Sequence, residues 1–330
     1  MPHGLRRYAL VFLSASALCW YGSALADQRP SLMTAVAQGD TQAVRELVAE
    51  GGDQEVKGET GRRALLHAAA VGDLQMVQTL LEFGADPNAR AKDKIARTAL
   101  ILAAAGGRSE VVKALVSKGA KLEAKDSSGK TALNWAAMQK RTQMVEVLLD
   151  KGADIKTTDH GGVRPLLFAV GRRDNATMQL LVVRGADLEV ESKQNKMTPL
   201  LLAIEGGQLD TVTYLLDKGA KVNGKNSDGL SPLMSASEKG DAKLVGLLLE
   251  RGANPNVRDA VGRTPLMYAA IAGDAAGAGV LLDKGADPSA EDNLGRTAAA
   301  WAEQRGQQAV LEMLARSAQP NPAVSSSPRE

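Results

Sequence analysis

The sequence predicts an all-helical repeat solenoid of nine copies, in which the two end copies are degenerate. A phrase of about 33 residues recurs along the chain, and its clearest form runs from Thr264-Pro265-Leu266 to Gly285-Ala286. A fixed period of this length is typical of stacked repeats and outweighs any local propensity. The residues aligned with Thr264 are Pro30, Arg63, Thr98, Thr131, Arg164, Thr198, Ser231 and Thr297.

Each copy begins with residues that suit the start of a helix. Thr or Ser at the aligned position offers a hydroxyl that can accept a hydrogen bond from a free N–H of the first turn. Pro at the next position, as in Pro265, needs no N–H partner and already has a helical φ. Leu133, Ala136 and Ala137 illustrate the apolar side that follows. Because two of these residues are small, a neighbouring helix can approach closely.

A second helix and a turn complete each copy. Gly at the ninth position after the cap, such as Gly273, permits a tight reversal after the first helix. The second helix carries one buried stripe, as Val112, Leu115 and Val116 show by their spacing of three and four. Gly119 then stands where a left-handed helix end is expected. The polar stretch that follows in every copy predicts a hairpin turn.

This pattern resembles the ankyrin-repeat family over about residues 29–315. The resemblance implies helix-turn-helix units joined by β-hairpin loops, and a concave groove that binds protein partners. One departure concerns the His that usually follows Thr-Pro-Leu and bonds to the turn of the next repeat. Mostly apolar residues, such as Leu201 and Met267, hold that position here. We therefore expect fewer tethers between the hairpins.

Residues 1–26 are predicted to be a signal peptide. Arg6 and Arg7 precede an apolar stretch, and the Ala-Leu-Ala site at 24–26 suits cleavage before Asp27. The apolar stretch is too short to span a bilayer comfortably. Periplasmic localisation is therefore expected, with secretion as the less favoured outcome. The paired arginines leave both the general and the twin-arginine export routes open.

Residues 27–316 are expected to form a single ankyrin-repeat domain, and the Pro- and Ser-rich residues 317–330 a disordered tail. Loss of Arg6 and Arg7 brings the 40 Lys and Arg residues level with the 38 Asp and Glu residues. A nucleic-acid partner would require a basic face, so none is expected. The mature chain has no further segment long enough to span a membrane, and a monomer is expected.

The residues of the mature chain argue against catalysis and against a metal or cofactor. Cleavage removes Cys19, the only cysteine, and leaves His67 and His160 as the only histidines. These two lie about three copies apart along the stack, so they cannot share a metal ion or a proton. The Gly-rich stretch 103–107 ends a helix instead of beginning one, which does not suit a phosphate site. We therefore expect that the protein is not an enzyme.

Aromatic residues gather at one position, four residues after the cap. Trp135, Phe168, Tyr268 and Trp301 occupy it, and His67 holds the same place in the second copy. Helical spacing puts this position opposite the buried stripe, and in ankyrin proteins that side lines the groove. Because Trp and Tyr commonly anchor interfaces, a recognition surface is favoured. Packing between neighbouring first helices is the alternative.

Polar residues of the hairpins are expected to form the rim of this surface: Lys94, Ser127, Lys130, His160, Lys196 and Arg263. The expected function is a non-catalytic scaffold that binds a protein partner through the groove and the hairpin tips. Some exported bacterial ankyrin proteins, which this chain resembles, are associated with catalase and oxidative-stress defence. The alternative is a secreted effector or an immunity protein that neutralises a toxin.

Overall fold

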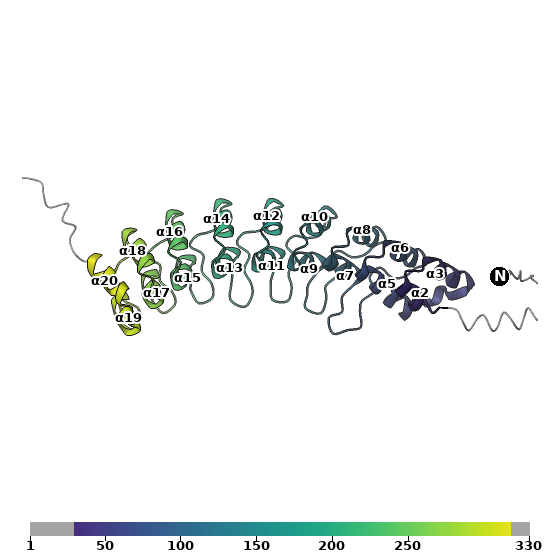
Figure 1. Cartoon of the computed structure of the whole chain (residues 1–330), viewed down its shortest axis with the longest axis horizontal. Coiled ribbons are helices and arrows are strands. Elements are labelled where there is room, and N and C mark those ends of the chain that lie inside the picture. Colours follow the sequence, from purple (N-terminus) through teal and green to yellow (C-terminus); the bar gives the residue numbers. More distant parts are fainter. Residues whose placement is uncertain (1–29, 318–330) are drawn as a thin grey trace, which may run out of the picture.

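The computed structural model describes residues 30–317, which form nine helix pairs stacked in one line (Figure 1). The first helices of the pairs make one row and the second helices another, with the connecting hairpins below the first row (Figure 1). The stack bends gently, and the first helices lie on the inner side of the bend (Figure 1). The nine predicted copies are confirmed, whereas the predicted signal peptide and nearly all of the predicted tail lie outside the described residues.

The bounds of the helices follow the predicted period. The first helices are α2 (Leu32–Gln38), α5 (Glu59–Val71), α7 (Ala99–Gly106), α9 (Ala132–Met138), α11 (Pro165–Gly171), α13 (Pro199–Glu205), α15 (Pro232–Glu238), α17 (Pro265–Ala272) and α19 (Ala298–Arg305). The second helices are α3 (Thr41–Leu47), α6 (Leu74–Glu82), α8 (Ser109–Ser117), α10 (Thr142–Asp150), α12 (Asn175–Val183), α14 (Leu209–Asp217), α16 (Ala242–Glu250), α18 (Ala275–Asp283) and α20 (Gln308–Ser317).

The predicted caps are present at the first helices of six copies. In each, the aligned hydroxyl accepts a hydrogen bond from the N–H three residues on, which satisfies a donor that the helix itself leaves free. Pro occupies the first helical position in α11, α13, α15 and α17. The capping residues are Thr98, Thr131, Thr198, Ser231, Thr264 and Thr297.

The first two copies depart from the predicted register. Ser31 caps α2, one residue after the aligned Pro30, because proline has no side-chain acceptor. The second copy begins its first helix at Glu59, four residues before the aligned Arg63. A π-helical turn, η1 (Val48–Gly52), and a short helix, α4 (Asp53–Lys57), replace the expected hairpin between these copies. Buried Gly61 lets α5 pass the carbonyl of Val56, where a Cβ atom would clash.

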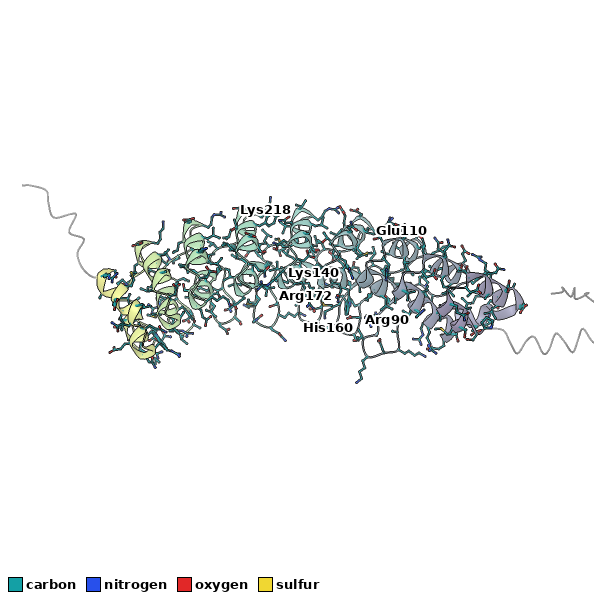
Figure 2. All side chains as sticks on the ribbon, in the orientation of Figure 1. Arg90, Glu110, Lys140, His160, Arg172 and Lys218 are labelled. Atoms are coloured by element: carbon teal, nitrogen blue, oxygen red, sulfur yellow. The ribbon has the colours of Figure 1, made fainter. Side chains whose placement is uncertain are left out.

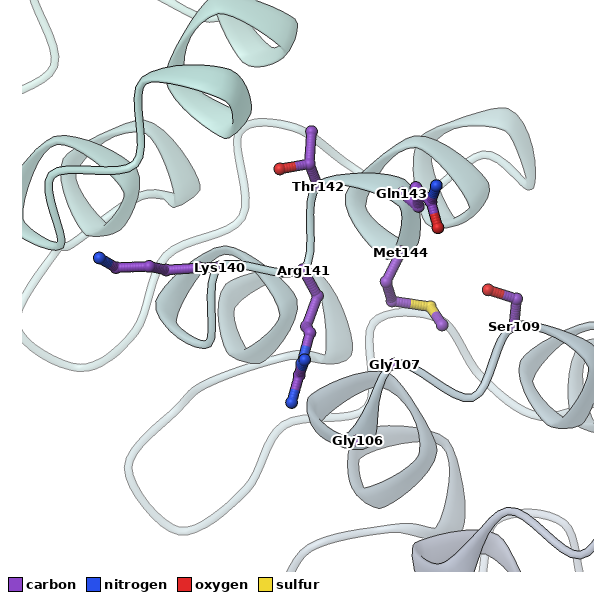
Figure 3. A pocket seen from close by; sticks show the side chains of 8 residues that line it. All are labelled: Gly106, Gly107, Ser109, Lys140, Arg141, Thr142, Gln143 and Met144. Atoms are coloured by element: carbon purple, nitrogen blue, oxygen red, sulfur yellow. The ribbon is translucent and has the colours of Figure 1, made fainter.

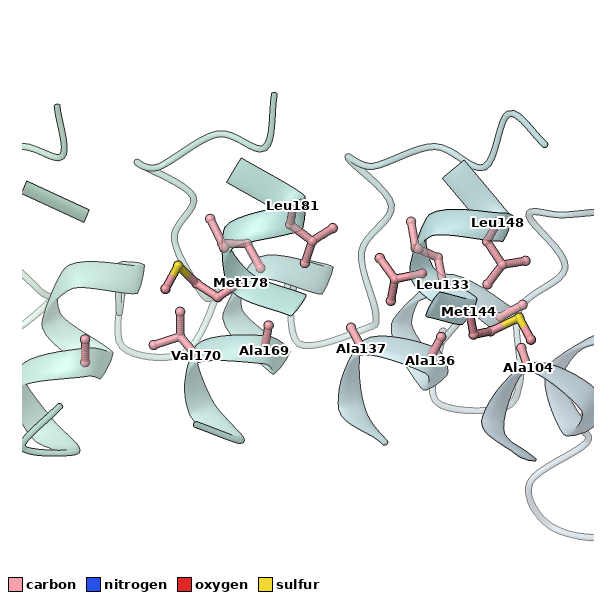
Figure 4. Close-up of a cluster of buried hydrophobic side chains, with 14 of the residues drawn as sticks. Ala104, Leu133, Ala136, Ala137, Met144, Leu148, Ala169, Val170, Met178 and Leu181 are labelled. Carbon is pink, nitrogen blue, oxygen red and sulfur yellow. The ribbon is translucent and has the colours of Figure 1, made fainter. Parts of the chain in front are cut away.

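The core lies between the two helix rows. Small residues of the first helices, such as Ala136 and Ala137, are fully buried and face the larger side chains of the second helices (Figure 4). Met144 and Leu148 of α10 fill the space above them (Figure 4). The same arrangement recurs in the fifth copy, so one continuous core extends through the described helices. Leu133 belongs to this core, being only 1% exposed.

Backbone hydrogen bonds join successive hairpins. In residues 30–317 the hairpins contain no strand, and the Arg90–Thr98 pair forms an isolated antiparallel bridge. Neighbouring hairpins are nevertheless linked, because an N–H of one donates to a carbonyl 32 residues earlier. These backbone bonds tie the hairpins without the family's His. They run from Ser127 to Ile95, His160 to Ser128, Lys193 to Gly161, Ser227 to Asn195 and Asn293 to Val261, over 2.8–3.1 Å.

A second set of bonds joins the loops that follow the second helices. The Asn223 side chain accepts the N–H of Asn254 at 3.0 Å and donates to the carbonyl of Gly252 at 3.2 Å. Asn88 and Asn256 make the same pair of bonds to the copies that follow them. These bonds and the core set the spacing of the copies, and so the spacing of the side chains on the inner side.

Candidate functional site

The inner row presents the five predicted residues to very different extents. His67 is exposed, and Trp135 and Phe168 are half-buried, so all three offer surface on the inner side. Tyr268 and Trp301 are buried, with 2% and 8% of their surface exposed. Packing between neighbouring elements, the alternative to recognition, therefore describes Tyr268 and Trp301. In these two copies a hairpin aspartate binds the polar group of the ring, and an arginine covers the ring.

Asp126 shows how this carboxylate works. One oxygen, Oδ1, accepts the N–H groups of Ser128 and Lys130 at 2.8 and 2.9 Å and so closes the hairpin turn. The other oxygen, Oδ2, accepts the indole N–H of Trp135 at 2.8 Å. The guanidinium of Arg97, from the preceding copy, lies over the same indole at 5.6 Å from its centre. One face of Trp135 is thus covered, and the ring is held in place.

The eighth copy repeats this arrangement with all its parts. Tyr268 donates its hydroxyl to Asp259 Oδ2 at 2.7 Å, and Arg263 Nε donates to the same oxygen at 2.9 Å. The Arg263 guanidinium also lies 4.6 Å from the centre of the Tyr268 ring. Arg263, predicted as a rim residue, is therefore bound to its own hairpin and first helix. Its paired charge is less available to a partner than a free arginine would be.

The ninth copy uses a tryptophan in the same way. Trp301 donates its indole N–H to Asp292 Oδ2 at 3.1 Å, and Arg296 Nε donates to that oxygen at 3.0 Å. The Arg296 guanidinium lies 3.8 Å from the ring centre, so the indole is enclosed between its helix and the hairpin. This contact is of the cation–π type, which gains strength when the pair is removed from water.

The carboxylates of these clusters are held in the ionised form. Burial works against their ionisation, but hydrogen bonds outweigh it, helped at Asp259 by the charge of Arg263. The pKa values of Asp126 and Asp259 therefore lie below their ordinary value. The pKa of Asp292 falls to about 2, with Arg296 as the main source of the opposing bonds. The pKa of Tyr268 is raised well above its ordinary range, by burial and by its bond to the Asp259 carboxylate.

The fifth copy differs because phenylalanine has no N–H or O–H to donate. Asp159 Oδ1 accepts the N–H of Val163 at 2.9 Å, as the turn requires. Its Oδ2 lies 3.4 Å from the Lys130 ammonium, which comes from the preceding copy. The same ammonium is 5.8 Å from the centre of the Phe168 ring. Lys130, predicted as a rim residue, therefore links two copies, and its ammonium lies over the Phe168 ring on the inner side.

The remaining rim residues are exposed. His160 donates its backbone N–H to Ser128, and its ring lies over Gly129, where a Cβ atom would come within 2.5 Å of it. Figure 2 shows His160 beside the hairpins, on the lower side of the stack. Lys196 has a φ of 50° at the hairpin position that glycine holds in other copies. Both side chains are available to a partner that contacts the hairpins.

Two features of the site were missed by the sequence reasoning. The aspartates were assigned to turn geometry alone, and that role accounts for only one of their two oxygens. A spacing of nine residues from Asp to the aromatic residue occurs in four copies and could have revealed the other role, which three of these pairs show. Arg97 carried no local signal, because it reaches a ring 38 residues further along the chain.

Several hollows in the described surface lie between copies and are open to solvent. One of about 350 Å³ opens between the helix–helix turns of the third and fourth copies, lined by Gly107, Lys140 and Arg141 among others (Figure 3). Within residues 30–317 no three side chains of His, Cys, Asp and Glu gather closely enough to hold a metal ion. No helix in that part of the chain is both long and apolar enough to cross a bilayer.

Comparisons with known proteins agree with this architecture. A family model described as "Ankyrin repeats (3 copies)" matches residues 14–91, 87–159, 166–259 and 244–323. The crystal structure of the ankyrin repeat domain of Bcl-3, described as a unique member of the IkappaB protein family, is 32% identical at a TM-score of 0.58. That match covers 62% of this chain and 92% of the Bcl-3 chain.

A second solved structure, the human ASB11 ankyrin repeat domain, is 24% identical at a TM-score of 0.58. It covers 68% of this chain and 100% of the ASB11 chain, and at this identity it supports the fold alone. No match was found among curated proteins.

Proposed function

We propose that this chain, which belongs to the ankyrin-repeat family, is exported to the periplasm and holds a protein partner against its inner side. Ankyrin repeats serve as scaffolds for protein–protein interaction, and proteins of the family are generally not catalysts. The finer parts of the proposal are the location, the surface used and the partner. They rest on the features of the inner row and of the amino-terminal sequence.

One observation carries the choice of surface. Trp135 and Phe168 are half-buried on α9 and α11, adjacent helices of the inner row. Each ring has a cation from the preceding copy on one side, which fixes its position before a partner arrives. A rigid aromatic with exposed surface loses little side-chain entropy on binding. The exposed His67, His160 and Lys196 would contact the partner at the helix and hairpin edges of this surface.

The buried members of the series have a supporting role in this proposal. Tyr268 and Trp301 are enclosed by their own hairpins, so they stabilise the last two copies. Lys130 and Arg263 are paired with Asp159 and Asp259, so their charges are less available to a partner. The main anchors are therefore expected in the fourth and fifth copies.

Truncation of the anchors tests the surface. Trp135→Ala and Phe168→Ala are each expected to weaken partner binding by about 2 kcal/mol or more, the scale of an interface hot spot. Leu133→Ala is the control for stability, because emptying a core position costs roughly 2–5 kcal/mol of folding free energy. The measurements are partner affinity and thermal unfolding of all three variants. If both aromatic variants keep wild-type affinity while melting as low as Leu133→Ala, the rings only pack and the surface is wrongly assigned.

The location and the partner can be tested together. We expect the mature protein to begin at Asp27 and to appear in the periplasmic fraction, because the Ala-Leu-Ala site directly precedes that residue. Amino-terminal sequencing that finds Met1 retained would contradict export. Capture of partners from periplasm by the mature chain would then separate an oxidative-stress enzyme such as a catalase from a toxin. A toxin would establish the alternative function of an immunity protein.

A further inference from the structure

The turns between the first and second helices carry an unusual group of cations. In the third, fourth and fifth copies they present five exposed basic side chains on one edge of the stack, away from the hairpins. Figure 2 shows Lys140 and Arg172 near the row of first helices, and His160 below them with the hairpins. We call this surface the basic edge: Arg108, Lys140, Arg141, Arg172 and Arg173.

Four of these five residues stand where the local structure favours something else. Lys140 and Arg173 have φ values of 56° and 55° at the turn position that glycine holds in the other seven copies. A side chain in this left-handed region is strained. Gly39, Gly72, Gly107, Gly207, Gly240, Gly273 and Gly306 are the glycines.

The next turn position is equally informative. Aspartate there caps the second helix in five copies, through Asp40, Asp73, Asp174, Asp241 and Asp274. Arg108 and Arg141 replace it, and α8 and α10 have no side-chain cap. Loss of such a cap destabilises a helix. Neighbouring copies that both lack the favoured turn residues, glycine or the capping aspartate, are expected where the surface has a function.

The charges of the basic edge are not neutralised within the fold. No carboxylate of residues 30–317 forms an ion pair with any of the five. Arg141 extends toward Gly106 and Gly107, with its Nε 3.4 Å from the Ala105 carbonyl (Figure 3). Arg173 donates to the carbonyl of Gly206. Bonds to neutral carbonyls position these groups on adjacent turns and leave their charges uncompensated.

Nearby carboxylates limit the extent of the basic edge. Glu110 is paired with Lys113 at 2.7 Å, and Asp174 accepts the N–H of Thr177. Asp73 holds the turn before the basic edge, and Asp210 lies in the first turn of α14 just after it. A long polyanion such as a nucleic acid would continue into these negative charges. The surface therefore suits an anion that is only a few turns long.

We propose that the basic edge binds a short acidic segment of a partner protein in an extended conformation. Packed helices lie about 10 Å apart, so three successive turns span about 20 Å. An extended chain of the polyproline II type rises about 3.1 Å per residue and has three residues per turn. Carboxylates three residues apart therefore lie on one side of the chain, about 9 Å apart, which matches the spacing of the turns. The proposal does not depend on the inner-row surface, because it uses other residues on another edge.

The probe is a fluorescent peptide, Glu-Gly-Ser-Glu-Gly-Ser-Glu, whose binding to the mature protein is followed by anisotropy at low salt. We expect saturable binding that weakens as salt is raised. A peptide with the same composition but adjacent glutamates should bind more weakly, because it reaches fewer turns. Equal binding of the two peptides, or no binding of either, would overturn the proposed register.

Variants of the basic edge separate binding from folding, and the double variant restores the residues typical of the other copies. Lys140→Gly with Arg141→Asp should melt at or above the wild-type temperature and bind the peptide about tenfold more weakly, since each exposed ion pair contributes a factor of up to about five. Arg172→Gln should weaken binding about threefold. Arg305→Gln, at the same place in the ninth copy, is the matched control and should change nothing.

The remaining outcomes decide the class of ligand. Unchanged peptide binding by the folded double variant would show that the peptide contacts another surface, and the proposal would fail. Tighter binding of a single-stranded oligonucleotide than of the peptide, lost in the same variant, would assign the edge to nucleic acid instead. Binding of anionic phosphatidylglycerol vesicles in preference to the peptide would assign it to a membrane.

Discussion

At the scale of single residues, the hairpin aspartates decide how much of each aromatic ring a partner can reach. Asp259 and Asp292 receive an arginine from their own copy, which completes the enclosure of Tyr268 and Trp301. Trp135 and Phe168 instead receive a cation from the copy before. The same position in the repeat therefore serves packing near the carboxy-terminal end and exposes aromatic surface in the middle.

The hydroxyl of Tyr268 gives a direct measure of this packing. Tyr268→Phe removes its bond to Asp259, and we expect a loss of about 2 kcal/mol in the free energy of unfolding, the usual worth of a bond to a charged group. Tyr214→Phe, in half-buried Tyr214 of α14, is the matched control and should cost much less. Urea unfolding at pH 7 measures both. Equal, small losses would show that the Asp259 bond contributes nothing.

The ninth copy should lose stability in acid. The pKa of Asp292 is about 2 in the folded protein, below the ordinary value of 3.8. The ionised carboxylate therefore contributes its full stability above about pH 4 and loses it as the pH falls through about 2. The difference in unfolding free energy between wild type and Asp292→Asn should narrow over that range. A difference that stays constant from pH 6 to pH 2 would contradict the assignment.

At the scale of the repeat elements, one link in the loop bonds is missing for a chemical reason. Asn88, Asn223 and Asn256 each accept and donate across the gap to the next copy. Lys156 holds the same place in the fourth copy, and a lysine ammonium cannot accept a hydrogen bond. The fourth and fifth copies, which carry the proposed surfaces, are joined near these loops by the ion pairs of Arg184 with Glu146 and Asp150.

Restoring the link should stabilise the stack. Lys156→Asn can accept the N–H of Asp187 and donate to the carbonyl of Gly185, which we expect to add about 1 kcal/mol to the free energy of unfolding. Asn223→Lys is the reciprocal variant and should remove a similar amount. Thermal unfolding of both proteins checks the pair. If the two changes have the same sign, the loop bonds do not hold the copies together.

At the scale of the whole molecule, each copy contacts mainly its neighbours, so damage should remain local. Gly219 has a φ of 93° and open space around it, which means that a side chain there is strained by the backbone alone. Gly219→Ala should cost about 1–2 kcal/mol. Gly246→Ala, at an equally open site inside α16, should instead stabilise by up to about 1 kcal/mol.

Hydrogen exchange distinguishes a local from a global effect of Gly219→Ala. Faster exchange is expected in α13 to α16, the helices of the copies on either side of Gly219. Uniform acceleration from α2 to α20 would mean that the described stack unfolds as one unit. That result would contradict a solenoid stabilised by neighbours.

The sequence by itself determined the period, the nine copies and most helix starts. Each of these depends on residues within one turn of a helix: Thr98 caps α7 through an N–H three residues away, and Gly107 ends that helix with a positive φ. Helix replaces the predicted hairpin before α5, where Arg63 and Ala64 provide neither a capping hydroxyl nor a proline to start a helix at the aligned position. Local chemistry was sufficient wherever the signal was complete.

Only the tertiary structure decided which side chains of the inner row remain accessible and which cations remain unpaired. Trp135 and Trp301 occupy the same place in the repeat, yet the first is half-buried and the second is 8% exposed. The difference arises from arginines that reach the rings from different copies. The contact between Arg97 and Trp135 joins residues in two different copies, so its geometry depends on how the copies stack, and no pattern within one copy predicts it.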